Sequence, residues 1–125
     1  MYTVTVIRDF IAQHFLIGGD WGDENKLHSH HYKVEVQLQG DTLDQHGYLV
    51  DIVEIENGLA EVIKYFSDKT VNELPEFENL NPSIEHFSRI MCEMFSRKIS
   101  QQNLKSLNLQ LWENETAWAS YSVKL

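Results

Sequence analysis

The sequence predicts an α+β fold, with strands near both ends of the chain and two helices between them. Apolar residues alternate with polar ones from Tyr32 to Gln39, which is the period of a half-buried β-strand. Between residues 52 and 99, apolar residues instead recur at helical spacing in two separate stretches. Two long strands, two helices and two further strands form an α+β order, not the alternating order of a parallel sheet.

The N-terminal third is expected to form two strands joined by a loop. Residues 2–7 are rich in β-branched and aromatic side chains, and we expect this strand to continue to residue 14 with a bend near residues 8–9. Glycine and aspartate in segment 18–25 predict a loop. The second strand is expected to run from about residue 28 to residue 39.

Three histidines in these two strands suggest a metal site. His28 and His30 are two positions apart, so on a strand they project from the same face. An antiparallel hairpin would bring His14 opposite this pair. Zinc takes nitrogen or sulfur donors in a tetrahedral arrangement, and an open catalytic site uses three protein donors plus water. A His-x-His pair alone is more often two surface imidazoles, and the third histidine is what favours zinc.

Two amphipathic helices are expected in the middle of the chain. Asp51 is a suitable N-cap for the first helix, and segment 82–85 opens the second. Segment 67–81, which contains Pro75, is expected to be mostly irregular. The expected apolar faces are Ile52, Ile55, Leu59, Val62, Ile63 and Phe66 in the first helix and Ile84, Phe87, Ile90, Met91, Met94, Phe95 and Ile99 in the second.

The C-terminal segment is expected to supply two more strands. Leucines alternate with polar residues over 107–111, and residues 117–123 form the next strand after a turn at 114–115. Four strands and two helices therefore account for most of the chain.

Length and composition narrow the class of protein. At 125 residues the chain is expected to form one domain spanning residues 1–125. No apolar run approaches a membrane span and no signal-peptide pattern is present, so we expect a cytoplasmic protein. The single Cys92 permits no internal disulfide. A net charge of −9 argues against nucleic acid as a partner, but zinc and local cations could still attract an anionic small substrate.

The histidine pattern resembles that of the 6-pyruvoyltetrahydropterin synthase and 6-carboxytetrahydropterin synthase family. The family pattern is F-x-A-x-H-x-L, a loop, and then H-G-H-x-Y at the start of a strand. Here residues 10–16 read F-I-A-Q-H-F-L and residues 28–32 read H-S-H-H-Y. The resemblance covers nearly the whole chain. It implies the T-fold, which is an antiparallel four-stranded sheet with two helices on one face, and it implies zinc ligation by His14, His28 and His30.

The resemblance also implies a substrate anchor. Family members carry a glutamate at the end of the third strand that holds the pterin ring, and Glu113 stands at that position. A carboxylate can accept two parallel hydrogen bonds from the 2-amino-pyrimidinone edge of a pterin. Glu115 is the less favoured substitute. Without the resemblance, a solvated charge at a strand end would be the simpler interpretation of Glu113.

Two catalytic positions depart from the family pattern. The family cysteine, four residues before the first histidine of H-G-H, is replaced by Glu24. The family Asp-His pair falls on Ser67 and Asp68 in an ungapped alignment, or on Asp68 and Lys69 with a one-residue gap. The usual proton shuttle cannot operate unchanged. Glu24 is the candidate general base and Asp68 or Lys69 the acid partner, while the alternative is that Glu24 is only a loop charge.

The sequence therefore predicts a zinc-dependent lyase of the 6-pyruvoyltetrahydropterin synthase type, acting on the side chain of a 7,8-dihydropterin such as dihydroneopterin triphosphate. Two alternatives stay open: a zinc- and pterin-binding member without turnover, and a structural T-fold subunit. Some family members that release a hydroxymethylpterin carry a glutamate where this chain has Asn25, so the product is not assigned. The resemblance implies a homo-oligomer, a hexamer, with no nucleic-acid or membrane partner.

Overall fold

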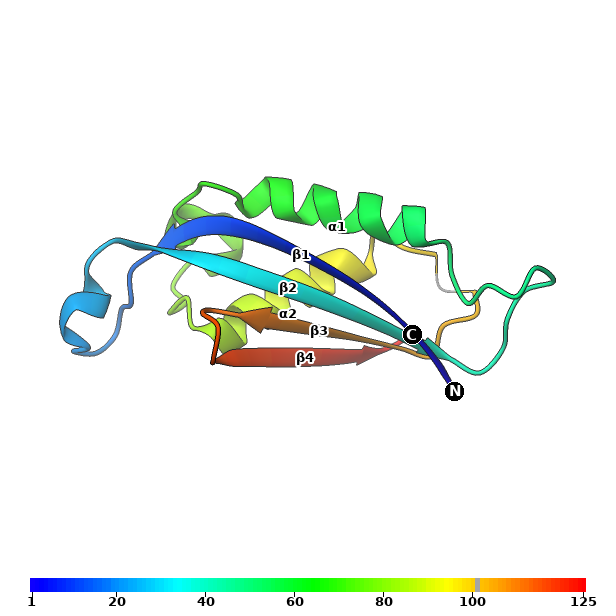
Figure 1. The fold of residues 1–125 in the computed structure, drawn as a ribbon. Coiled ribbons are helices and arrows are strands. Elements are labelled where there is room, and N and C mark those ends of the chain that lie inside the picture. Colours follow the sequence, from blue (N-terminus) through cyan, green and yellow to red (C-terminus); the bar gives the residue numbers. More distant parts are fainter. Residues whose placement is uncertain (101) are drawn as a thin grey trace.

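The computed structural model describes residues 1–100 and 102–125, which form a four-stranded antiparallel sheet with two helices on one face (Figure 1). The strands lie in the order β1 (Tyr2–His14), β2 (His28–Gly40), β3 (Ser106–Trp112) and β4 (Trp118–Lys124). The helices are α1 (Ile52–Phe66) and α2 (Ile84–Ser96), with short 3-10 turns η1 (Gly22–Asn25), η2 (Val71–Glu73) and η3 (Pro75–Phe77). The predicted architecture is confirmed.

The first two strands pair without interruption along their whole length. The register runs from Tyr2 opposite Gly40 to His14 opposite His28, so the bend expected near residues 8–9 does not break the ladder. Strand β3 is much shorter and pairs with β2 only from residue 33 onward. Residues 28–32 of β2 therefore extend past the end of β3, and this overhang carries the His-x-His pair.

The core lies between the sheet and the two helices. Alternate residues of the central strands, such as Val36 on β2 and Leu109 on β3, are fully buried on the helix-facing side. Helix α2 packs over β3 and β4, while α1 lies beside β1 (Figure 1). Near the overhang, Phe10 stacks on Tyr32 with ring centroids 5.2 Å apart, and Phe87 of α2 meets the Tyr32 ring at the same distance. This aromatic cluster supports the histidine end of the sheet.

Both helices begin at side-chain caps. Asp51 accepts a hydrogen bond from the Val53 N–H at 2.9 Å, and Ser83 accepts one from the His86 N–H at 3.2 Å. The cap predicted at Asp51 is thus confirmed. The prediction that Ile52 belongs to the buried face is wrong, because the first turn of α1 is uncovered and Ile52 is 50% exposed.

The connector over residues 67–81 is more ordered than expected. It contains the turns η2 and η3, and it reverses direction at Asp68, which adopts a positive φ of 62°. The Asp68 N–H donates to the Ile11 carbonyl at 2.7 Å, and the Gln13 N–H donates to the Lys69 carbonyl at 2.9 Å. The connector therefore covers the outer edge of β1 just before that strand ends.

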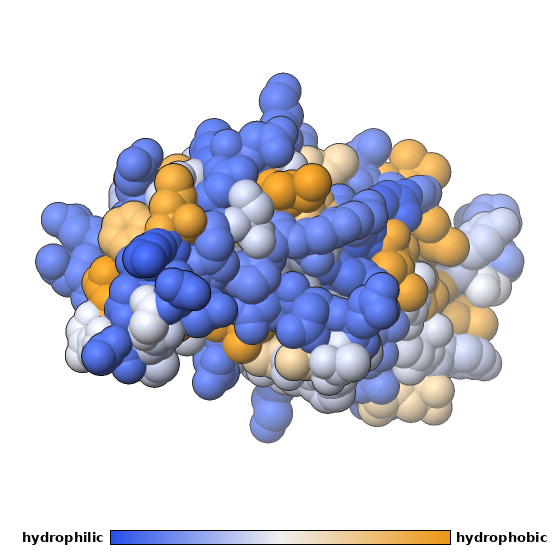
Figure 2. Space-filling model, turned by 60° about the vertical axis from the view of Figure 1, so that its left-hand side comes forward, coloured by the Kyte–Doolittle hydropathy of each residue, from blue (hydrophilic) through white to orange (hydrophobic). Residues whose placement is uncertain are grey.

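One face of the molecule is mainly polar. On the face drawn in Figure 2, hydrophilic residues predominate and hydrophobic residues form small, separate groups. None of the helices in the described part of the chain is both long enough and apolar enough to cross a bilayer.

The single cysteine offers a test of the packing. Cys92 is fully buried on α2, and burial raises the pKa of its thiol to about 12. Because the thiolate is the reactive form, we expect no alkylation by iodoacetamide at pH 8 in the native protein. Mass spectrometry should show one modification per chain only after unfolding in guanidinium. Rapid labelling of native protein would contradict the packing of α2 described above.

Candidate functional site

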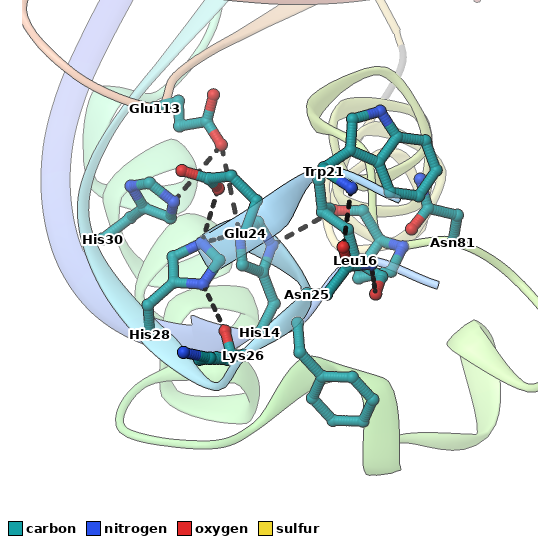
Figure 3. A network of polar contacts seen from close by, with 12 residues as sticks. His14, Leu16, Trp21, Glu24, Asn25, Lys26, His28, His30, Asn81 and Glu113 are labelled. Atoms are coloured by element: carbon teal, nitrogen blue, oxygen red, sulfur yellow. Dashed lines mark hydrogen bonds and ion pairs between the residues drawn. The ribbon is translucent and has the colours of Figure 1, made fainter. Parts of the chain in front are cut away.

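Three imidazoles converge at one end of the sheet. His14 is the last residue of β1 and His28 the first of β2, directly opposite it in the register, and His30 follows on the same face. The ring centroids are 4.5 Å apart for His14 and His28, 4.9 Å for His14 and His30, and 4.8 Å for His28 and His30 (Figure 3). The structure thus brings the three predicted ligands together.

The tautomers of two rings are set by backbone carbonyls. His14 Nδ1 lies 3.2 Å from the Pro82 carbonyl oxygen, and His28 Nδ1 lies 2.7 Å from the Lys26 carbonyl oxygen. A carbonyl only accepts, so each Nδ1 carries the hydrogen, and each neutral ring then presents Nε2 as an acceptor. These two Nε2 atoms face one another at 2.9 Å. Two lone pairs at that separation repel unless a proton or a metal cation lies between them.

Burial keeps His14 in a ligand-competent form. His14 is only 2% exposed, and desolvation, followed by the neighbouring His30 and His28, lowers its pKa from 6.5 to about 4. This imidazole is therefore neutral at physiological pH. His30 Nε2 is buried and has no hydrogen-bond partner among the described residues. A buried nitrogen without a hydrogen-bond partner, beside two acceptor nitrogens, fits a site for a cation.

Two carboxylates complete the cluster. Glu24 Oε2 lies 3.0 Å from His28 Nε2, and Glu113 Oε1 lies 3.4 Å from His30 Nε2 and 4.0 Å from His14 Nε2. Figure 3 shows both carboxylates turned toward the imidazoles. One donor atom from each of the three histidines and from Glu24 lies within 4.8 Å of the others. Three nitrogens and a carboxylate oxygen are a donor set that suits zinc.

The loop after β1 holds Glu24 in place through its backbone. The Leu16 N–H donates to the Glu24 carbonyl at 2.9 Å. The Asn25 amide nitrogen donates to the carbonyls of Leu16 and Gly19, each at 2.9 Å, and its oxygen accepts from the Trp21 N–H at 2.6 Å. Glu24 therefore belongs to a cross-linked turn, η1, and its carboxylate is presented to the histidines.

Two further asparagines fix the chain where it leaves β1. Asn72 accepts from the Phe15 N–H at 3.0 Å and donates to the Phe15 carbonyl at 2.8 Å, while Asn81 accepts from the Ile17 N–H at 2.8 Å. His86 of α2 is half-buried, and its Nδ1 lies 2.9 Å from the Asn81 carbonyl oxygen. Sequence reasoning missed these asparagines, whose only signal was amide side chains within a connector.

A pocket of about 560 Å³ opens beside the overhang of β2, next to the β3–β4 turn. This volume is in the range that holds a small ligand. His30 and Glu113 belong to both the pocket and the histidine cluster, so a molecule in the pocket would lie against the candidate metal donors. The lining consists of Asp9, Ser29, His30, His31, Tyr32, Lys33, Glu113, Asn114 and Glu115.

The remaining predicted residues lie at the margin of the site. The neighbouring His31 points away from the cluster, and its Nε2 is 2.7 Å from Asp9 Oδ2 on the exposed face. Asp68 and Lys69 lie along the outer edge of β1, where the Lys69 ammonium is 4.7 Å from the centroid of the Tyr65 ring. Within the described residues, neither side chain forms a hydrogen bond or ion pair with the histidine cluster. The structure therefore groups Glu24 with the histidines, but not these two residues.

Comparisons with known proteins point to one family. The model of the 6-pyruvoyl tetrahydropterin synthase family matches residues 3–124. A candidate 6-carboxy-5,6,7,8-tetrahydropterin synthase of Archaeoglobus fulgidus is 26% identical over 97 residues, which covers 75% of this chain and 74% of that protein.

Solved structures show the same fold. The 6-pyruvoyl tetrahydropterin synthase of Caenorhabditis elegans superposes with a TM-score of 0.82 at 19% identity, covering 96% of this chain and 94% of that one. The Plasmodium vivax 6-pyruvoyltetrahydropterin synthase, solved as a variant with a catalytic glutamate changed to alanine, gives a TM-score of 0.78 at 13% identity over 100% of both chains. The T-fold implied by the sequence is thereby confirmed.

The asparagine contacts predict a stability effect. Asn72→Ala removes both hydrogen bonds to the Phe15 backbone and leaves partly buried groups without partners, so the free energy of unfolding should fall by about 1–3 kcal/mol. Thermal or urea unfolding measures this change. The matched control is Asn57→Ala on the exposed side of α1, which should alter stability by less than about 0.5 kcal/mol. Equal effects of the two substitutions would refute the structural role of Asn72.

Proposed function

The chain belongs to the 6-pyruvoyl tetrahydropterin synthase family, and we propose that it is a zinc-dependent lyase acting on the side chain of a 7,8-dihydropterin such as dihydroneopterin triphosphate. One observation carries the proposal. The Nε2 atom of His30 lies 3.4 Å from Glu113 Oε1, so the candidate metal donors and the candidate ring anchor meet at the wall of one pocket.

Zinc is proposed to be held by His14, His28 and His30. The fit rests on the two opposed acceptor nitrogens and on the buried Nε2 of His30, which has no hydrogen-bond partner among the described residues. When bound, the metal polarises the oxygens of the substrate side chain and so acidifies the adjacent C–H bond. The hydrogen bonds to the carbonyls of Pro82 and Lys26 hold two of the rings in the required tautomer and orientation.

Glu113 is proposed to anchor the pterin ring. Its side chain is 28% exposed, so it is partly shielded from water yet open to the pocket. The carboxylate can accept two parallel hydrogen bonds from the 2-amino-pyrimidinone edge, which fixes the ring in one orientation. With the ring held at Glu113, the side chain of the pterin extends toward the histidines.

Glu24 is proposed as the general base. Its carboxylate lies beside His28, and its side chain is 53% exposed, so it has space to reach a substrate proton. The catalytic glutamate of the Plasmodium vivax relative supports a carboxylate in such a role. Asp68 and Lys69 are the proposed acid partners, located beside the end of β1.

A second candidate function is a zinc- and pterin-binding protein without turnover. One observation favours it: the histidines and Glu113 converge, whereas Asp68 and Lys69 lie along the β1 edge without a hydrogen bond or ion pair to the cluster within the described residues. Such a protein would bind the substrate and release it unchanged.

We further propose a cytoplasmic homo-oligomer, a hexamer by family resemblance, without nucleic-acid or membrane partners. The sheet order leaves β1 and β4 as edge strands. The connector covers only the end of β1, and unpaired strand edges favour pairing with another copy.

The zinc assignment predicts a defined metal content. The purified protein should contain about one zinc per chain by elemental analysis, and His28→Ala should remove most of it. His31→Ala is the matched control, because this neighbouring imidazole pairs with Asp9 on the exposed face and should leave the zinc content unchanged. Full occupancy in the His28 variant would overturn the ligand assignment.

The anchor assignment predicts a selective loss of ligand binding. Glu113→Ala should weaken the binding of neopterin by roughly 1.5–3 kcal/mol, because a charged, bidentate contact is lost. Calorimetric titration measures the affinity, and zinc content and melting temperature should stay near those of the wild type. Glu115→Ala lines the same pocket and is the control. If Glu115→Ala alone weakens binding, the anchor is Glu115.

Turnover separates the two candidate functions. Dihydroneopterin triphosphate is incubated with the zinc-saturated protein, and pterin products are identified by mass. Glu24→Gln should lower the rate by about 10²-fold or more, the usual contribution of a positioned base, with little change in pterin affinity. Full activity of this variant would remove Glu24 from the mechanism. A wild type that binds dihydropterins but converts none of those tested would favour the binding protein.

A further inference from the structure

We propose that the Glu24 carboxylate is the fourth protein donor of the metal site, so that the protein alone closes the coordination shell in the resting state. The inference rests on the zinc part of the proposed function and assigns Glu24 a second role there.

The distances support direct ligation. Metal–nitrogen and metal–oxygen bonds of about 2.0–2.2 Å place neighbouring donors of a tetrahedron roughly 3.3–3.6 Å apart. Glu24 Oε2 lies 3.0 Å from His28 Nε2, the two facing nitrogens lie 2.9 Å apart, and all four donor atoms lie within 4.8 Å of one another. Side-chain shifts of a few tenths of an ångström for the closest pairs, and of about an ångström for the widest, would give tetrahedral spacing.

The two carboxylates of the site differ in ways that separate their roles. Glu24 belongs to the group of four donors, and it does not line the pocket. Glu113 lines the pocket, and its nearest oxygen is farther from the histidines, at 3.4 and 4.0 Å. The structure therefore directs Glu24 to the metal and Glu113 to the ligand.

The backbone supports a donor at residue 24. The turn η1 is tied to the end of β1 by the Leu16–Glu24 hydrogen bond and by the Asn25 amide. A carboxylate presented from such a turn loses less conformational entropy on ligation than one on a free loop. With the hydrogen on His28 Nδ1, the ring offers an acceptor Nε2 toward the carboxylate, so a cation between the two groups would satisfy both.

A closed shell has a consequence for binding. A catalytic zinc site keeps one position open, whereas four protein donors leave none. The pterin side chain can therefore approach only when the Glu24 carboxylate turns away, and its 53% exposure leaves space for that movement. The carboxylate released by ligand entry is then the free base that the reaction requires, so ligand binding and base availability are coupled.

The alternative is an ion pair without ligation. In the metal-free protein, a protonated His28 could donate to Glu24 across the same 3.0 Å, and a metal bound to His28 Nε2 would replace that hydrogen. In this alternative Glu24 is not a donor to the bound metal.

Cobalt tests the proposal without any enzymatic assay. Zinc is removed by a chelator and replaced by Co²⁺, whose visible absorption reports the number and type of its donors. The variants are Glu24→Ala and the isosteric Glu24→Gln. Asp23→Asn is the matched control. Asp23 is adjacent to Glu24 in the sequence, its side chain is 97% exposed, and the substitution removes one negative charge. Protection of Cys92 from alkylation confirms that each variant is folded.

We expect the Glu24→Ala spectrum to differ from the wild type, and zinc affinity measured by chelator competition to fall at least about 10-fold, the minimum seen for outer-shell partners of metal ligands. Asp23→Asn should match the wild type in both measurements. Superimposable spectra with equal zinc affinities in all proteins would overturn the proposal and leave the ion pair.

Neopterin distinguishes this inference from the proposed enzymatic function. Adding it to the cobalt-loaded wild type should change the spectrum, while the Glu24→Ala spectrum should respond less because no carboxylate remains to be displaced. If the variants differ from the wild type but neopterin alters neither spectrum, Glu24 is a permanent donor. The ligation is then supported, while the pterin function fails.

Discussion

The pairing register of β1 and β2 is the constraint on which the whole site depends. A slip of one residue would move every side chain of a strand to the opposite face, so His28 would no longer face His14. Buried cross-strand pairs prevent such a slip, and the stacked pair of Phe10 and Tyr32 lies directly beside the histidines. The same apolar alternation that builds the core therefore also places the candidate metal donors, and no separate device is needed to align them.

The unequal lengths of the strands decide where a ligand can enter. Strand β3 ends opposite Lys33, so the first residues of β2 have a partner strand on one side only. The pocket occupies the space on the other side, and the β3–β4 turn brings Glu113 across it. His14 is almost completely buried, while Glu24 remains half-exposed. The cluster therefore extends from the buried interior to the protein surface.

The sequence predicted most of the fold because its signals were periodic. Alternation located the strands, helical spacing and the Asp51 cap located the helices, and histidine spacing predicted a convergence that depends on two-residue strand geometry. The asparagine contacts and the short turns of the connector could not be predicted in this way. Asn25 and Asn72 act through hydrogen bonds from one side chain to the backbone of another segment, and such contacts leave no period in a sequence.

In the proposed roles of Glu24, a carboxylate where the family pattern has a cysteine would change more than the identity of a base. A thiolate is a soft donor with a single sulfur, whereas a carboxylate has two oxygens and is a harder donor. A carboxylate can leave a zinc ion at lower cost in a half-exposed position, because water solvates it readily once it is free. The longer side chain also reaches the histidines from a turn that is anchored at its backbone. Glutamate at this position is therefore compatible with the proposed site, in which Glu24 binds the metal at rest and turns away when a ligand enters.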